Sequence, residues 1–346
     1  MRKGIILLII LFTIAIPVFA MEFTAPTVPE SGQEFMPADI QSFGDGLWYV
    51  LKSAVNKLAP SISESAGICF SIITITILVS VIKNLPYSSD SIIKLVTALM
   101  ISVSLLKPTN SLITLGIKTV QEISEYGKLL LPVMTAALAA QGGVTTSTVL
   151  YTGTALFNSI LSSLISHIIV PMIYVYLCLS IANSAMEEDI LKNMKQFIKW
   201  LMTWSLKIIL YVFTGYIGIT GVVSGTVDAS AIKATKLAIS GFVPVVGGII
   251  SDASETILVS AGLMKSTVGV YGLLAIMAVW IGPFLRIGIQ YILLKLTSGI
   301  CNVFGSKQIT ALIEDFTGAM GFLLAMTGTL CLLLLISTVC FMKGVS

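Results

Sequence analysis

The sequence has few charged residues and a single histidine, and each shortage excludes a class of protein. Only 11% of the 346 residues are charged, whereas soluble domains have about a quarter, so a soluble globular domain is excluded. The net charge of +3 comes from scattered basic residues, which excludes the clustered Lys/Arg surface of a nucleic-acid-binding protein. His167 is the only histidine, so a histidine-based metal cluster is also excluded.

The cysteines and the sequence motifs give no sign of catalysis. None of the five cysteines lies in a CxxC spacing, and all lie within or beside apolar segments, so we interpret them as small apolar side chains packed between helices. The sequence has no Walker-type glycine loop, no nucleophile elbow and no zinc-ligand spacing. We therefore predict no catalytic residue, no metal site, no cofactor and no enzymatic activity.

What the sequence has in abundance is apolar residues. They make up 56% of the chain, and the mean hydropathy is +0.98. This composition predicts an all-α, multi-pass membrane protein with about eight spans. Two short broken or re-entrant helices, several interfacial amphipathic helices and an internal duplication complete the predicted architecture.

The N-terminal region predicts export of the N-terminus. Residues 1–20 have a basic start, an apolar core and a small-residue cleavage site at Ala20, as in a secretory signal peptide; an uncleaved anchor is the alternative. Residues 21–65 then form an extracytoplasmic lead-in with an amphipathic helix. Two spans follow in residues 66–108, and Lys83 and Lys94 flank the loop between them, which favours a cytoplasmic loop.

Residues 109–128 predict an amphipathic helix. Its polar residues step by four, three, four and three, while apolar residues occupy another face; the polar set is Thr114, Lys118, Gln121, Glu125 and Lys128. The apolar piece that follows, 129–143, is short, begins near Pro132 and ends at Gly142 and Gly143. We predict a helix broken at Pro132, because proline removes an amide donor and disfavours helix in the preceding residue.

The stretch from 231 to 258 has the same design. It breaks at Gly241 and Pro244, loosens at Gly247 and Gly248 and restarts as a short apolar piece. A broken helix within hydrocarbon is tolerated only where protein or a water-filled cavity satisfies the freed backbone groups. We therefore expect both broken helices to be buried by neighbours or to line a path, and their proline and glycine residues are candidate conduit residues.

The order of elements indicates a duplication. Pro132 and Pro171 are 39 residues apart, as are Pro244 and Pro283, and each pair is followed by an amphipathic segment and a long apolar run. The predicted repeats are residues 109–224 and 225–346. If each short piece crosses the bilayer, the halves are parallel; if each is re-entrant, they are inverted. The lysine distribution does not decide between them.

Four polar residues in the second repeat are candidate intramembrane groups. Asp252 and Glu255 lie one turn apart, as a cation or proton site or as a wetted helix end. Arg286 and Gln290 lie four apart on one helical face, with Arg286 either at the membrane surface or paired with a buried carboxylate. For His167 we prefer a polar cap between two membrane helices over a proton relay.

The stretches LLLPVMTAALAAQGG (129–143) and AIKATKLAISGFVPVVGGIISDASETIL (231–258) resemble the stage III sporulation protein AE family of endospore-forming bacteria. The resemblance implies a subunit of the channel, or feeding tube, between mother cell and forespore, in the outer forespore membrane. It implies partners among the other membrane proteins of the same operon and, indirectly, a secretion-type ATPase. It implies no catalytic residue.

Three hypotheses follow for function. The first is an integral subunit of the sporulation channel complex that is needed for forespore development. The second is an autonomous secondary transporter. The inverted-repeat alternative favours it, because many secondary transporters are built from inverted repeats. The third is a non-conducting membrane platform that recruits partners. We prefer the first, because a self-contained ion-coupled carrier more often has a convergent acidic cluster. The expected contacts are with lipid, partner proteins or a second copy, and not with nucleic acid.

Overall fold

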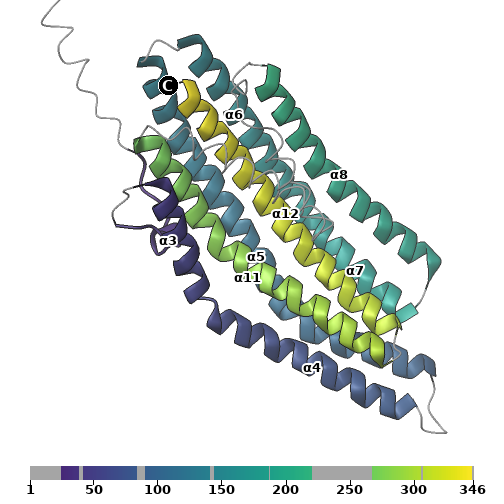
Figure 1. The fold of residues 1–346 in the computed structure, drawn as a ribbon. Helices are drawn as coiled ribbons and strands as arrows, with labels where there is room; N and C mark the ends of the chain where they lie inside the picture. The colour runs from purple at the N-terminus through teal and green to yellow at the C-terminus, as the bar shows by residue number, and fades with distance from the viewer. Residues whose placement is uncertain are drawn as a thin grey trace, which may run out of the picture.

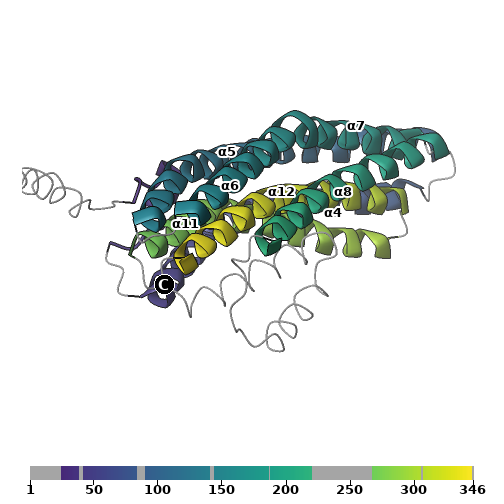
Figure 2. The ribbon, with the colours of Figure 1, turned by 90° about the horizontal axis from the view of Figure 1, so that it is seen from above.

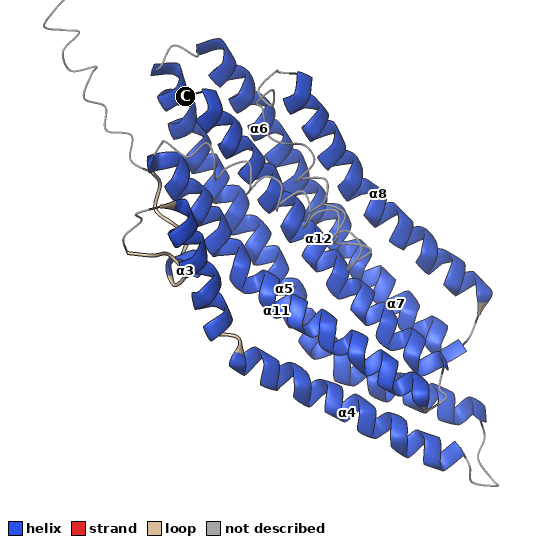
Figure 3. Cartoon of the chain, in the orientation of Figure 1, coloured by secondary structure: helices blue, strands red, loops and turns tan. Residues whose placement is uncertain are grey.

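The computed structural model describes residues 25–38, 42–83, 90–140, 144–186, 188–219, 267–304 and 307–344. These residues form a bundle of long helices (Figure 1), with no strand among them (Figure 3). In chain order the elements are α2 (Glu30–Gln33), α3 (Phe43–Asn56), α4 (Ala59–Lys83), α5 (Asp90–Ala140), α6 (Val144–Leu164), the π-helical segment η2 (Ile165–Ile169), α7 (Val170–Met186), α8 (Asp189–Ile219), α11 (Thr267–Val303) and α12 (Lys307–Gly344). The predicted all-α fold is confirmed for this part of the chain.

Six helical stretches of the described residues are long and apolar enough to cross a membrane, so the prediction of a membrane protein is supported. The predicted total of about eight spans is not confirmed, because the segment 220–266 lies outside the described residues. The helices are longer than a bilayer requires. With 51 residues, α5 measures about 76 Å at 1.5 Å per residue, against about 30 Å for the hydrocarbon core.

The predicted break at Pro132 is wrong, because α5 is continuous through both Pro108 and Pro132. It joins what we predicted as a span, an amphipathic helix and a separate short piece. A proline inside a helix removes one hydrogen bond and costs about 3 kcal/mol. Here the turns around Pro132 are held by packing, since the neighbouring Leu131 and Met134 are each only 1% exposed. Tertiary packing therefore overrides the local signal.

Pro171 is accommodated differently, by a widened turn. Residues Ile165–Ile169 form a π-helical turn, and the amide of Val170 donates to the carbonyl of Ile165, five residues back. This turn comes directly before Pro171, whose ring would otherwise clash with the carbonyl four residues back. The result is one long helix through α6, η2 and α7. The amphipathic segment and the long apolar run that we predicted after Pro171 likewise form one helix, α8.

Helix α12 runs through the middle of the bundle, where it contacts α5, α6, α7, α8 and α11 (Figure 2). Contacts near its two ends show whether each neighbouring helix runs parallel or antiparallel to it. Against α11 and α7 it is antiparallel: Glu314 lies near Ser298 and Asp315 near Tyr176, whereas its far end lies near the start of α11 and near α6. Helix α8 runs parallel to α12, since Lys195 at its beginning reaches Asp315.

These directions bear on the predicted duplication. The pair α7 and α8 has the same order and the same directions as the pair α11 and α12, which agrees with the parallel alternative. Helix α8 ends, and α11 begins, at the same end of the bundle (Figure 1). The duplication itself is not confirmed, and its second broken helix lies outside the described residues.

The N-terminal helices pack on one side of the bundle. Ser42 caps α3 by accepting a hydrogen bond from the amide of Asp45, and α2 and α3 both contact α11. The contact is close at glycines: a Cβ on Gly46 would lie 2.5 Å from a methyl carbon of Leu274. Here we predicted an interfacial amphipathic helix. The helix is present, and it packs against α11; its position at the membrane interface stays a prediction.

Candidate functional site

A polar groove lies between α5 and the helix that follows it. Its volume is about 280 Å³, and it is lined by Gln121, Ser124, Glu125 and Lys128 of α5 and by Ser159, Ser162, Ser163, Ser166 and His167 of α6 and η2. Five of these nine side chains are serine hydroxyls. The other four are one amide, one carboxylate, one ammonium group and one imidazole. The groove is therefore rich in hydrogen-bonding groups and low in net charge.

The α5 side of the groove is formed by the polar face of the amphipathic helix that the sequence predicted. Gln121, Glu125 and Lys128 are exposed on one face, while Val120 and Ile123 are at most 1% exposed on the other. The four-three spacing keeps the polar side chains in one line along the helix. Pro132 follows Lys128 by four residues and is also exposed, so this conduit candidate continues the same line beyond the groove.

The other side of the groove depends on the π-helical turn. Ser159, Ser163 and His167 follow one another at spacings of four, and Nδ1 of His167 lies 3.0 Å from the carbonyl oxygen of Ser163. Leu161 and Ile165 are fully buried behind them. The fifth residue of the widened turn changes which side chains face outward, and single π-turns within α-helices are frequent at functional sites. His167 lines a groove here, which agrees with its predicted position between two helices.

Asn158 joins the two helices beside the groove. Its side chain is 1% exposed, and its Nδ2 donates to the carbonyl oxygen of Ser124 at 3.2 Å and to the Ser124 hydroxyl at 3.3 Å. Its Oδ1 is buried and accepts no hydrogen bond from the described residues. A buried amide oxygen without a donor is costly, by about 1–3 kcal/mol, so this position favours a polar neighbour such as water.

The two charged residues of the groove, Glu125 and Lys128, have no oppositely charged partner in the described part of the chain. Among the described residues, neither Glu125 nor Lys128 forms an ion pair, whereas one turn away Lys118 pairs with Glu122 at 3.5 Å. Glu122 also contacts the hydroxyl of Ser31, which ties α2 to α5. Such exposed charges cannot lie against acyl chains without a large penalty. The groove must therefore face water or another protein.

The structure separates the other predicted site residues. Arg286 is exposed and Gln290 is 3% exposed, so these two residues do not share an environment, although both lie on α11. Seven candidates lie outside the described residues: Gly142, Gly143, Pro244, Gly247, Gly248, Asp252 and Glu255. Their roles as conduit residues or intramembrane charges stay predictions.

A second polar cluster links α7, α8 and α12. The ammonium group of Lys195 lies 2.6 Å from Oδ2 of Asp315, and the hydroxyl of Tyr176 donates to Oδ1 of the same carboxylate at 3.1 Å. The side chains of Lys195 and Asp315 are only 12% and 14% exposed. The next carboxylate, Glu314, pairs with Lys295 of α11 at 3.5 Å, but this pair is more than half exposed.

Sequence reasoning missed both the serine side of the groove and this ion pair. The serines had a usable signal, since Ser159, Ser163 and Ser166 recur at helical spacing together with His167. The ion pair had none, because 120 residues separate Lys195 from Asp315.

The chain matches the sequence profile of the family described as stage III sporulation protein AE over residues 40–344. It is 21% identical over 319 residues to the stage III sporulation protein AE of Bacillus subtilis (strain 168), a match that covers 90% of this chain and 79% of that protein. No solved structure matches the chain. The matched residues include the whole groove and the Lys195–Asp315 pair.

Proposed function

The chain belongs to the stage III sporulation protein AE family, and from this membership and the polar groove we propose that it is an integral membrane subunit of the sporulation channel complex. This complex links the mother cell to the forespore, and the subunit is needed for forespore development. It lies in the mother-cell-derived outer forespore membrane. Its partners are the other membrane proteins of the same operon and, through them, a secretion-type ATPase.

The observation that carries the proposal is the groove between α5 and α6. A bundle made only to anchor partners has no need for a row of exposed hydroxyl, carboxylate and ammonium groups along two long apolar helices. Polar groups at such places face the interior of an assembly or a water-filled path. We propose that this groove is the face that the subunit turns toward the conduit, in place of the broken helix predicted at Pro132.

The test is to fill the groove with apolar side chains. The double variant Ser159→Leu/Ser163→Leu removes two exposed hydroxyls and adds bulk, and both positions keep a good helix former. We expect heat-resistant spore counts to fall by about two orders of magnitude, while the level of the protein in the membrane fraction and its co-purification with partners stay unchanged.

The matched control is Ser71→Leu/Thr74→Leu on α4. These hydroxyls are also exposed, and each donates only to a carbonyl of its own helix, but they lie away from the groove. The control should form spores normally. Normal sporulation by the groove variant as well would overturn the conduit proposal and favour a platform that only recruits partners.

The groove also fits a second candidate, a self-contained carrier. Its polar lining and its volume of about 280 Å³ would suit a small polar solute, and small-molecule sites commonly have about this size. Purified protein in liposomes decides between the two candidates. A channel subunit without its partners should show no solute uptake above empty vesicles, whereas robust uptake by the purified chain alone would remove the channel-subunit proposal.

A further inference from the structure

The two charged groups of the groove belong to one turn of α5. Ser124, Glu125 and Lys128 all line the groove, and they lie within about 6 Å of one another along the helix axis. Spacings of three and four residues place them on one side of the helix. Glu125 and Lys128 are exposed, whereas Ser124 is only 2% exposed. This turn therefore has a carboxylate and an ammonium group at the opening of the groove and a hydroxyl at its floor.

Both charges of this turn are free to bind a ligand. Glu125 and Lys128 form no ion pair with each other or with any other described residue. The preceding turn, by contrast, has the pair Lys118–Glu122. A carboxylate binds an ammonium group, and an ammonium group binds a carboxylate, through short charge-assisted hydrogen bonds. The ligand that satisfies both groups at once is small and has one charge of each sign.

The floor of the groove has unused hydrogen-bonding capacity. The hydroxyl of Ser124 accepts a hydrogen bond from Nδ2 of Asn158 at 3.3 Å, but it donates to no described residue. A hydroxyl can both accept and donate, so its proton is left for a ligand in the groove. Oδ1 of Asn158 likewise accepts nothing from the described residues. Buried polar groups are normally satisfied, so unused capacity in two adjoining side chains indicates a polar occupant.

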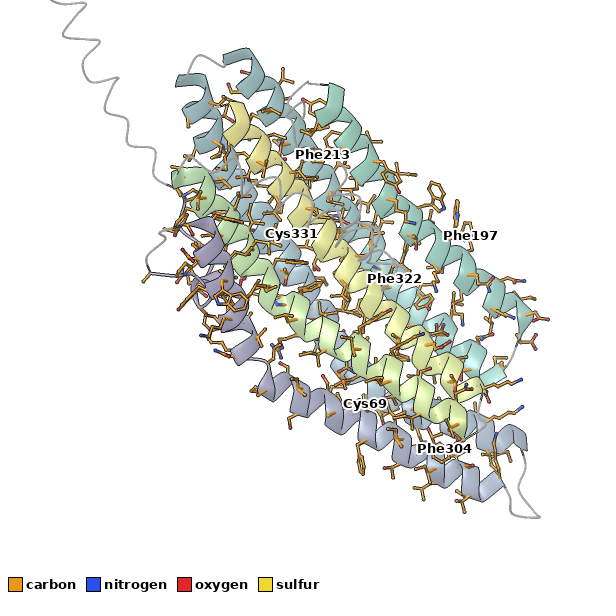
Figure 4. All side chains as sticks on the ribbon, in the orientation of Figure 1. Cys69, Phe197, Phe213, Phe304, Phe322 and Cys331 are labelled. Carbon is orange, nitrogen blue, oxygen red and sulfur yellow. The ribbon has the colours of Figure 1, made fainter. Side chains whose placement is uncertain are left out.

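The α6 side of the groove is held in place from behind. Phe157 makes an edge contact with Phe213 of α8 at a centroid distance of 5.4 Å, and Phe213 is fully buried on the side of α8 that faces the bundle (Figure 4). Side chains two residues apart point to nearly opposite sides of a helix. With Phe157 directed toward α8, Ser159 is therefore turned toward α5, where it lines the groove.

From this geometry we infer that the groove binds a free α-amino acid as its zwitterion. Lys128 binds the α-carboxylate, and Glu125 binds the α-ammonium group. The hydroxyls of Ser124 and Ser159 donate to the carboxylate. The groove volume of about 280 Å³ is large enough for a molecule of this size. The role of the site rests on the proposed function: in a groove that faces the conduit, a bound amino acid is a molecule in transit.

The test compares alanine with two molecules that each lack one of its charged groups. Propionate lacks the ammonium group, and ethylamine lacks the carboxylate. Saturation-transfer difference NMR measures their binding to the purified full chain in detergent at neutral pH. Alanine should bind at least about tenfold more tightly than the other two, because each of them loses one charge-assisted contact. Equal binding of the three molecules, or no binding of alanine, would overturn the site.

Two single variants test the assigned roles. Glu125→Gln should weaken alanine binding by about tenfold and leave propionate binding unchanged, because only the contact with the ammonium group is lost. Lys128→Gln should weaken alanine binding to a similar extent and leave ethylamine binding unchanged. The matched control is Lys118→Gln, which changes an exposed lysine of the same helix outside the groove and should not alter alanine binding. An equal loss in all three variants, or no loss in the first two, contradicts the site.

A lipid headgroup is the other source of the same chemistry. Phosphatidylethanolamine has an ammonium group close to a phosphate, so it is added to the micelles as a competitor, with phosphatidylglycerol as the control lipid. Alanine binding that persists supports a soluble ligand. Displacement by phosphatidylethanolamine alone assigns the groove to a lipid and overturns the amino acid.

The binding site and the conduit can fail separately, because binding is measured on the purified chain without partners. Loss of selective alanine binding, with spore formation still blocked in Ser159→Leu/Ser163→Leu, would remove the amino acid site and keep the conduit. Normal sporulation by that double variant, with selective alanine binding by the unchanged chain, would keep the site and remove the conduit.

Discussion

Helices α8 and α12 occupy equivalent places in the two predicted halves of the chain, yet their surroundings are opposite. In the most apolar eighteen-residue stretch of each helix, 94% of α12 is buried and only 22% of α8. The sequences explain the difference. From residue 316 to residue 342, α12 has no charged residue, and a helix that is apolar all round belongs in the interior of a bundle. Helix α8 alternates lysines with aromatic residues, so it stays at the edge.

The contrast teaches that two helices with the same order and direction can have different tasks. Helix α12 is the element on which five others pack, so its role is structural. Helix α8 contacts α6, α7 and α12 and leaves an aromatic face uncovered within the described part of the chain. Even if the halves share an origin, their last helices are no longer equivalent.

The largest effect should come from matched truncations of one phenylalanine on each helix. Phe322 of α12 is 1% exposed and makes an edge contact with Tyr176 at 6.0 Å, whereas Phe197 of α8 is 60% exposed. We expect Phe322→Ala to lower the free energy of unfolding by about 3 kcal/mol or more, because it leaves a cavity. Phe197→Ala should change it by less than about 1 kcal/mol. Unfolding of the purified protein by graded SDS measures both, and equal losses would contradict the contrast.

The next effect concerns the ion pair that joins the two helices. We expect Asp315→Asn to destabilise the chain by about 2–3 kcal/mol, because Lys195 then lies largely buried without a counter-charge. The control is Glu314→Gln, which breaks the exposed pair with Lys295 and should cost at most about 1 kcal/mol. A double-mutant cycle with Lys195→Gln isolates the coupling between the partners. A coupling near zero would mean that α8 is held by its apolar contacts alone.

The smallest effect should differ in sign between the two environments. A Cβ on Gly127 of α5 would lie 2.7 Å from a methyl carbon of Leu334 in α12, whereas a Cβ on Gly215 of α8 would meet nothing within 4 Å among the described residues. Gly127→Ala should therefore destabilise by about 1 kcal/mol. Gly215→Ala should stabilise by up to about 0.8 kcal/mol, the helix preference of alanine over glycine. The same SDS titration measures the free energy of unfolding of both variants. If both substitutions changed it in the same direction, α12 would have moved to accommodate the added methyl group.

Local patterns predicted the helices well because they depend on neighbouring residues. The polar line of α5 and its buried opposite face follow directly from the spacing of Gln121, Glu125, Val120 and Ile123, and these exposures are confirmed. Proline was the weak point. The break at Pro132 is absent because packing against α11 and α12 holds the flanking turns, and packing cannot be read from the residues next to a proline.

Only one side of the groove could be predicted, because the other side depends on structure that neighbouring residues do not reveal. The α5 side has charged residues at regular spacing and stands out in the sequence. The α6 side consists of serines, which give a weak signal in an apolar segment, and its alignment depends on a π-helical turn that no residue pattern announces. In the cluster of Lys195, Asp315 and Tyr176, Asp315 lies 120 residues from Lys195 and 139 from Tyr176 in the sequence, so only the folded chain could reveal it.

The unbroken length of α5 has a mechanical consequence. Between Asp90 and Ala140 the helix has no loop that could act as a joint, and it is packed along its length by other long helices. A continuous helix of this kind transmits a displacement of one end to the other end, about 76 Å away, because no joint between them can bend. The two ends of this subunit would then move together whenever an assembly pulls on either of them.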